Sequence, residues 1–121
     1  MTVDGSKQRY RVDYDQTYSP VVTWPATRYF FIHSSINGWH THQLDFLLAY
    51  TQADVERDLY MELPKGIHLP GHEKGQYVLQ LVKNLYRQKQ AGRIWHEHLK
   101  LRLKEMNFKQ SSIDECVLYY K

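Results

Sequence analysis

The chain has 121 residues, of which 42% are hydrophobic and 24% charged, which predicts one globular domain with a modest core and excludes a disordered segment. Its 16 Lys and Arg against 13 Asp and Glu leave a formal net charge of +3, too small for a protein that binds nucleic acid through charge alone. A single cysteine excludes an internal disulfide, and no apolar run approaches the ~20 residues that cross a bilayer, so we expect an intracellular protein without a membrane partner.

The first regular element that the sequence predicts is a helix, which follows a polar and turn-rich N-terminal segment. Thr23 is a candidate N-cap because its hydroxyl can accept a hydrogen bond from a free backbone N–H of the first turn. Pro25 is tolerated in that turn, and residues 26–36 continue the helix. Asn37 and Gly38 accept the left-handed backbone that commonly ends a helix, so we expect the helix to stop there.

The middle of the chain predicts extended structure. Residues 42–48 form a short apolar run between polar residues, which indicates a buried strand, and residues 47–53 are expected to begin a short helix. Residues 59–63 are a second extended candidate. Residues 70–75 have the composition of a loop. In residues 76–82, apolar side chains recur at every second position, as in a strand with one apolar face.

The C-terminal third predicts a second long helix over residues 93–106. One apolar stripe runs along it, formed by Trp95, Leu99, Leu103 and Met106. Asn107 can end this helix in the left-handed region, and residues 117–120 are expected to form a final strand. Because helices and strands mix without strict alternation, the predicted fold class is α+β, with a small mixed or antiparallel sheet and two main helices.

Residues 43–50 carry the first pattern with chemical meaning. Asp45 ends an apolar run that could hold its carboxylate rigidly, and carboxylate oxygens are the ligands that Mg²⁺ prefers. The backbone carbonyl of Phe46 could be another ligand. Ala49 is small enough to let a deoxyribose approach, and Tyr50 could occupy the space of a 2′-hydroxyl. The alternative for Asp45 is a strand-end or turn carboxylate without a catalytic role.

A second pattern lies just before and at the start of the C-terminal helix. Lys89 and Arg93 could contact phosphates there, and Gln90 could hydrogen-bond a nucleotide or a template. Positive charge is not favoured at a helix N-terminus, which adds some support for an anionic partner. The alternative is a solvated basic helix start.

The histidines and the cysteine are weaker candidates for chemistry. His40 and His42 stand near Asp45, and His96 is two residues from His98, but neither pair has the spacing of four residues that places two histidines on one helix face. Cys116 lacks the partners of a thiol nucleophile. We therefore expect no zinc site and no cysteine chemistry.

Many short segments, in one order along the chain, are together far more specific than either pattern alone. They lie at residues 4–8, 12–22, 37–39, 43–50, 59–66, 85–95, 108–111 and 114–117. In these segments the chain resembles the reverse transcriptase domain of Ty1/copia-type retrotransposons. The resemblance implies a right-hand polymerase fold, with a fingers part at about residues 1–40 and a palm part at about residues 41–121.

The resemblance also implies a function and a set of site residues. It implies an RNA-directed DNA polymerase that uses Mg²⁺ and binds an RNA or DNA template–primer and dNTPs. Asp45 matches the first catalytic carboxylate and Mg²⁺ ligand, Tyr50 the sugar-gate aromatic beside Phe46 and Ala49, and Gln90 the glutamine of the Lys-Gln-Ala motif.

The chain departs from the family pattern in three places. The family's Tyr-x-Asp-Asp hairpin and its Lys-x-Arg fingers strand are not found in this sequence, and Arg87 stands where the family usually has Gly. If position 87 needs a positive φ, Arg costs on the order of 1 kcal/mol there. We therefore expect a polymerase fragment that is inactive alone, with the remaining polyprotein regions as partners. The alternatives are a non-enzymatic nucleic-acid-binding or interaction module and a non-functional retrotransposon remnant.

Overall fold

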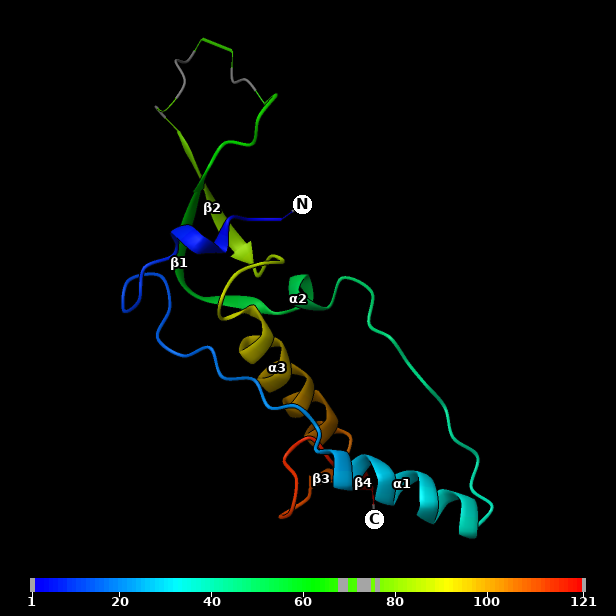
Figure 1. Cartoon of the computed structure of the whole chain (residues 1–121). Helices are drawn as coiled ribbons and strands as arrows, with labels where there is room; N and C mark the ends of the chain where they lie inside the picture. Colours follow the sequence, from blue (N-terminus) through cyan, green and yellow to red (C-terminus); the bar gives the residue numbers. More distant parts are fainter. Residues whose placement is uncertain (1, 68–69, 72–74, 76, 121) are drawn as a thin grey trace.

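The computed structural model describes residues 2–67, 70–71, 75 and 77–120. The elements, in chain order, are the 3₁₀ turn η1 (Gly5–Lys7), α1 (Trp24–Ile36), α2 (Ala49–Gln52), β1 (Asp54–Glu62), β2 (Val78–Lys83), α3 (Ala91–Glu105), β3 (Phe108–Gln110) and β4 (Leu118–Tyr120). The strands form two separate antiparallel pairs, β1–β2 and β3–β4 (Figure 1). The α+β class, the small antiparallel sheets and the two main helices, α1 and α3, are thus confirmed.

Local capping signals define helix α1, as the sequence predicted. Thr23 precedes the helix in an extended conformation, and its hydroxyl accepts a hydrogen bond from the Ala26 N–H at 3.4 Å. At the other end, the Asn37 side chain donates to the carbonyl of His33 at 2.7 Å. Gly38 follows with a φ of 63°, which glycine adopts without steric cost.

The predicted buried strand at residues 42–48 is wrong. These residues form an open segment, and the side chains of Leu44 and Leu47 are 83% and 82% exposed. A strand requires a neighbouring backbone to pair with, and none of the described residues supplies one for this segment. The apolar run therefore suggested a buried strand, but the described structure contains no strand that pairs with it. The short helix expected from residues 47–53 is confirmed as α2, which begins after Leu48 at a φ of 53°.

The extended candidates at residues 59–63 and 76–82 are confirmed as β1 and β2, although β1 begins earlier in the chain than expected. Residue 76 lies outside the described residues, as do residues 72–74 of the predicted loop. The two strands make one long hairpin that projects from the rest of the chain (Figure 1).

Pairing within the hairpin is regular toward its tip and shifts toward its base. Leu59 lies opposite Leu81, and the register changes between Leu59 and Asp54. Asp54 lies opposite Lys83, and their side chains form an ion pair at 2.6 Å. The hydrogen bond and the charge of Lys83 lower the pKa of the Asp54 carboxyl.

Helix α3 extends the predicted helix by two residues at its N-terminus and ends before Met106, which is the C-cap. Asn107 adopts a φ of 68°, which confirms it as the left-handed residue that ends the helix. The chain then returns as β3 and β4, where the rings of Phe108 and Tyr120 pack at a centroid distance of 5.7 Å. The final strand is thus confirmed, and its partner β3 was not predicted.

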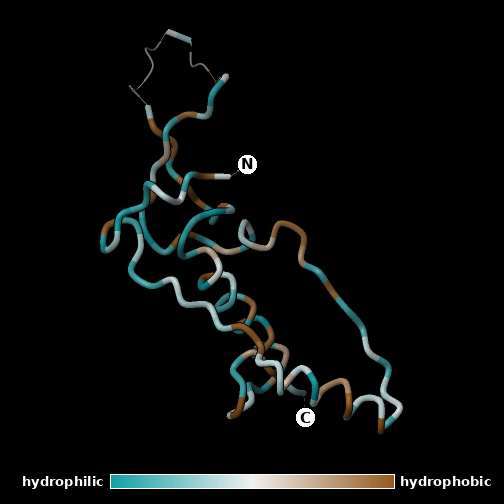
Figure 2. Tube along the Cα trace, in the orientation of Figure 1, coloured by the Kyte–Doolittle hydropathy of each residue, from teal (hydrophilic) through white to brown (hydrophobic). Residues whose placement is uncertain are grey.

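The hydrophobic core is small. The buried apolar side chains among the described residues are those of Ala53, Leu59, Ala91 and Ile94. The chain exposes 10089 Å², whereas a compact monomer of 14.6 kDa would expose about 6,900 Å². Figure 2 shows hydrophobic residues along α1 and along the segment that leads into α2. Within the described ranges, no helix has the length and apolar character needed to span a bilayer.

Candidate functional site

Asp45 lies on the open segment between α1 and α2. Its side chain is exposed, and it forms no hydrogen bond or ion pair with any described residue. No polar contact therefore links it to Tyr50 or Gln90, the residues with which the sequence grouped it.

Aromatic contacts connect the segment around Asp45 to the start of α3. The ring of Phe46 meets Trp95 edge to face at a centroid distance of 5.3 Å. Four residues later, Tyr50 packs on Tyr86 at 4.7 Å. Ala49 begins α2 between these contacts and is half-buried. The structure thus brings residues 43–50 and 85–95 together at two points, as one site requires.

The turn that enters α3 has an unusual backbone. Arg87 adopts a φ of 72°, so the position usually occupied by Gly in the resembling family does need a left-handed conformation. The Gln88 side chain supports the turn by accepting a hydrogen bond from the Leu85 N–H at 3.0 Å. Gly5 packs so closely that a Cβ there would overlap the carbonyl oxygen of Arg87. The N-terminal 3₁₀ turn and the turn before α3 are therefore fitted to each other.

Gln90 is buried at the start of α3, with a relative exposure of 4%. Its Oε1 accepts a hydrogen bond from Gln8 Nε2 at 3.0 Å. The neighbouring Lys89 also contacts Gln8, through its backbone N–H at 2.8 Å and its Nζ at 3.3 Å. The Lys89 ammonium lies 5.0 Å from the centroid of the Tyr14 ring and donates to its hydroxyl at 3.3 Å. The N-terminal segment thus covers this part of the predicted site.

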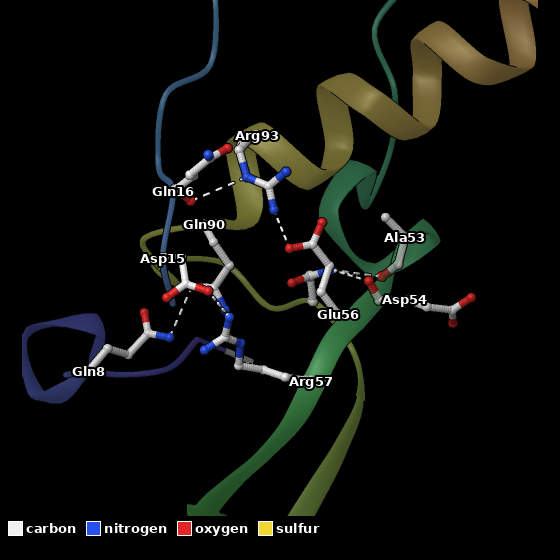
Figure 3. A network of polar contacts seen from close by, with 10 residues as sticks. Gln8, Asp15, Gln16, Ala53, Asp54, Glu56, Arg57, Gln90 and Arg93 are labelled. Atoms are coloured by element: carbon white, nitrogen blue, oxygen red, sulfur yellow. Dashed lines mark hydrogen bonds and ion pairs between the residues drawn. The ribbon is translucent and has the colours of Figure 1, made fainter. Parts of the chain in front are cut away.

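Arg93 points from α3 toward β1, as Figure 3 shows. Its guanidinium forms an ion pair with Glu56 and donates to the Gln16 carbonyl at 3.2 Å. Beside it, Arg57 forms an ion pair with Asp15. The two pairs border a cavity of about 270 Å³, which is lined by Asp13, Tyr14, Asp15, Gln16, Glu56, Arg57, Gln90, Arg93 and Ile94.

The charges around this cavity are nearly balanced. Asp13, Asp15 and Glu56 face Arg57 and Arg93, so the cavity has no general excess of positive charge. An anion at Arg93 would have to compete with the Glu56 carboxylate for the charge of the guanidinium. The two predicted nucleic-acid contacts, Lys89 and Arg93, are thus both engaged with protein groups in this structure.

A larger, open cavity of about 540 Å³ lies between the N-terminal segment and the β1–β2 hairpin. Apolar residues of the hairpin, such as Leu59 and Met61, line one part of it, and Asp4 and Lys7 line another. The hydroxyl of Ser6 hydrogen-bonds the Asp4 carboxylate at 2.6 Å and, as the largest cause, lowers the pKa of that group. Asp45 lines neither cavity.

The described residues do not assemble a metal site. Within the ranges that the structure covers, no group of three or more His, Cys, Asp or Glu side chains could hold a metal ion. Asp45 would offer one carboxylate, but two-metal catalysis requires several oxygen ligands around ions about 4 Å apart. The residues described here therefore do not fit a complete magnesium site.

Three residues of this region were not singled out from the sequence. Gln8 was included in the resembling segment at residues 4–8, but no role was assigned to it. Glu56 lies in a charged strand without a distinctive pattern. Asn84 is fully buried and donates from Nδ2 to the carbonyls of Ala53 and Asp54 at 3.1 and 2.7 Å. A polar residue directly after an apolar strand was the available signal for Asn84, whereas the other two depend on long-range contacts.

Comparison with known families gives a match over the whole chain. Residues 1–121 match the family described as "Reverse transcriptase (RNA-dependent DNA polymerase)". No solved structure matches the chain significantly.

Individual relatives come from plants and yeast. The chain is 32% identical over 121 residues to the retrovirus-related Pol polyprotein from transposon TNT 1-94 of Nicotiana tabacum, and 32% identical over 114 residues to that from transposon RE1 of Arabidopsis thaliana. It is 30% identical over 94 residues to the transposon Ty1-H Gag-Pol polyprotein of Saccharomyces cerevisiae. These alignments cover 100%, 94% and 74% of the chain, but only 9%, 8% and 5% of the respective polyproteins.

Proposed function

The chain belongs to the reverse transcriptase (RNA-dependent DNA polymerase) family, and on that premise we propose that it contributes nucleotide and template–primer contacts to a Ty1/copia-type polymerase. The match over residues 1–121 is the observation that carries this proposal. Residues 1–40 would belong to the fingers and residues 41–121 to the palm. Other regions of the Pol polyprotein would complete the enzyme, which joins dNTPs to a primer.

The contacts between the two motif segments support one shared nucleotide site. By resemblance, Tyr50 and Ala49 would adjoin the sugar, and Gln90 would hydrogen-bond the nucleotide. The packing of Tyr50 on Tyr86 and of Phe46 on Trp95 fixes these segments side by side. Side chains from residues 43–50 and 85–95 can therefore act on one ligand, although they are far apart in sequence.

Phosphates are the proposed ligands of Lys89 and Arg93. A guanidinium can bind phosphate through two parallel hydrogen bonds, and an ammonium acts as a point charge. Because Arg93 is paired with Glu56, a bound phosphate would either displace that carboxylate or lie beside it. Either arrangement predicts a weak affinity that is sensitive to the charge at position 56.

Asp45 is the proposed carboxylate ligand of Mg²⁺, in a family that generally uses divalent metal ions. Its exposure leaves the oxygens open to an ion. Since the described residues provide no carboxylate cluster around it, further ligands would come from other parts of the polyprotein. We therefore expect no primer extension by the 121-residue chain alone.

Binding of a fluorescent template–primer duplex, followed by anisotropy at low salt, tests the proposed contacts. We expect Arg93→Ala to weaken binding and to reduce the slope of log K against log salt by about 0.9, the value for one lost phosphate contact. Glu56→Gln should strengthen binding roughly threefold, because it removes the competing charge.

A second Arg–Glu pair, in which both residues lie on α3, provides matched controls. Arg102 pairs with Glu105 at 2.9 Å; both side chains are largely exposed, and neither residue lines the cavity. Arg102→Ala and Glu105→Gln should leave the affinity and the salt slope unchanged. Equal effects at both pairs, or no binding by the wild-type chain at low salt, would contradict a specific site at Arg93.

A non-enzymatic nucleic-acid-binding module is the second candidate. The observation that favours it is a Lys89–Gln90–Arg93 cluster without an assembled metal site in the described residues. Primer extension with Mg²⁺ distinguishes the two candidates if it is performed with the chain extended into the rest of its polyprotein. Extension that Asp45→Asn abolishes supports the polymerase, whereas duplex binding without extension supports the module.

A further inference from the structure

The hydrogen bonds around Gln8 determine which way its side-chain amide faces. The backbone N–H of Lys89 can only donate, and it lies 2.8 Å from one side-chain atom of Gln8. That atom must be an acceptor, which identifies it as the carbonyl oxygen Oε1. The other end of the amide, Nε2, is then a donor. The orientation of Gln8 thus follows from a backbone group whose role is fixed.

The orientation of Gln8 in turn determines that of Gln90. Gln8 Nε2 lies 3.0 Å from the side chain of Gln90 and donates to it. The receiving atom must be Gln90 Oε1, so Gln90 Nε2 faces the other way. An inverted Gln90 would place two donors against each other and lose this hydrogen bond.

The outward-facing Nε2 of Gln90 is available to a ligand. It donates to no described residue, yet it is not among the buried polar atoms left without a partner, so it retains accessible surface. Gln90 lines the 270 Å³ cavity together with Arg93 and Tyr14. A buried side chain whose N–H₂ group donates to no described residue thus lines a cavity that also contains two guanidinium groups and three carboxylates.

Backbone contacts hold Gln8 in place. Its carbonyl accepts from Lys89 Nζ at 3.3 Å, and its N–H donates to the Gly5 carbonyl at 3.3 Å. Gly5 itself is fitted against the carbonyl oxygen of Arg87. Gln8 is therefore attached to the segment that contains Gln90 by its main chain as well as by its side chain, whose contact with Gln90 is drawn in Figure 3.

We propose that Gln8 is a positioning residue that fixes the Gln90 carboxamide so that its N–H₂ group donates to an acceptor oxygen of a bound nucleotide. This inference rests on the proposed function, since it concerns the same site. The oxygen belongs to a phosphate, either of a free triphosphate or of the template–primer backbone.

Gln8→Glu tests this role because it changes one donor into an acceptor at almost the same size. The introduced carboxylate can still accept from the Lys89 N–H, but its second oxygen cannot donate to Gln90. The Gln90 amide should turn round, give its N–H₂ to that carboxylate and present Oε1 to the cavity. Gln16→Glu is the matched control, since Gln16 lines the same cavity and its side chain forms no hydrogen bond with Gln90.

Two measurements on the full chain read out the result. The ¹H–¹⁵N side-chain amide signals of Gln90 should shift in Gln8→Glu and stay in place in Gln16→Glu. The affinity for inorganic triphosphate, and separately for a template–primer duplex, should fall about tenfold more in Gln8→Glu than in the control. The ligand that shows the difference identifies the source of the phosphate.

The outcomes separate this inference from the proposed function. Unmoved Gln90 amide signals in Gln8→Glu, or equal losses of affinity in both variants, would overturn the role of Gln8. If the wild-type chain bound neither ligand, the proposed function would fail, and with it the ligand assigned to Gln90. A shift of the Gln90 signals without binding would then leave Gln8 as a purely structural partner, which also overturns the proposal.

Discussion

Two regions of the molecule differ in the contacts that stabilise them: one depends on long-range contacts and the other on local ones. In the packed unit, formed by residues 2–16, the β1–β2 hairpin and α3, partners distant in sequence hydrogen-bond one another, as Gln8 and Gln90 do across 82 positions. The α1 arm, residues 23–48, is stabilised mainly by local contacts and keeps large apolar side chains exposed, with Trp24 at 74% and Ile36 at 77%. Its long-range contacts lie at its two ends, from Thr23 to Asp114 and from Phe46 to Trp95.

The difference shows what local and long-range interactions each contribute. Capping groups are enough to start and stop α1, but they do not bury its apolar side chains. In the packed unit, polar groups fix the relative positions of segments that share few buried apolar residues. If the two regions are independent, a substitution in one should leave the stability of the other unchanged.

The largest expected effect is the loss of the packed unit in Gly5→Ala. The added Cβ would overlap the Arg87 carbonyl oxygen, and backbone atoms cannot move aside as a flexible side chain can. We expect a loss of about 2–3 kcal/mol in the free energy of unfolding, measured by urea denaturation. Gly92→Ala is the control: its nearest neighbour, Ser19 Cβ, is at an ordinary 3.6 Å, and a helical Gly→Ala change should stabilise by about 0.5 kcal/mol. Equal changes in the two variants would show that the close approach has no energetic role.

Thr23→Ala should affect the α1 arm without disturbing α3. The substitution removes the hydroxyl that caps α1 and that donates to Asp114 Oδ2 at 2.8 Å. We expect a cost of about 1 kcal/mol, seen as faster amide hydrogen exchange in α1. Thr27→Ala is the comparison, because its hydroxyl only contacts the preceding turn. Faster exchange throughout α3 would mean that the two regions unfold together.

Arg87→Gly should stabilise the packed unit slightly. Glycine adopts the observed φ of 72° without the steric cost that arginine bears, and its greater freedom in the unfolded chain offsets part of the gain. We expect a net gain of about 0.5 kcal/mol, measured as a raised urea midpoint. Arg102→Gly, in the last turn of α3, should instead cost up to about 1 kcal/mol. A destabilised Arg87→Gly variant would indicate that the arginine side chain contributes contacts that outweigh its backbone.

Acid should loosen the attachment of the α1 arm. The Thr23 N–H first of all, then the Cys116 N–H and the Thr23 hydroxyl, hydrogen-bond the Asp114 carboxylate and lower its pKa below the ordinary value. Because the folded pKa is the lower one, this stabilisation is present above the unfolded pKa of about 3.9 and is lost as the pH falls through the folded value. The protection of the α1 amides, taken as the ratio of the intrinsic to the observed exchange rate at each pH, should therefore fall below about pH 4 in the wild type, and Asp114→Asn should remove that dependence. An unchanged dependence in the variant would assign it to another carboxylate.

Sequence reasoning succeeded where the information is local and failed where a partner was required. The caps of α1, the hairpin strands and the end of α3 at Asn107 depend on neighbouring residues, and all were predicted. The strand at residues 42–48 was wrong because no described backbone pairs with it. The site shows the same division: Gln90 was found from its motif, but its partner Gln8 could not be recognised as such.

By itself, the sequence determined the family, the α+β class and the ends of the main helices, because these depend on short motifs and on backbone preferences of single residues. Only the tertiary structure decided that Lys89 and Arg93 bind protein groups, that Arg87 is held in a left-handed turn, and that Gln8 faces Gln90. These features join residues up to 82 positions apart, and the free energy of such contacts depends on their spatial arrangement rather than on their spacing along the chain.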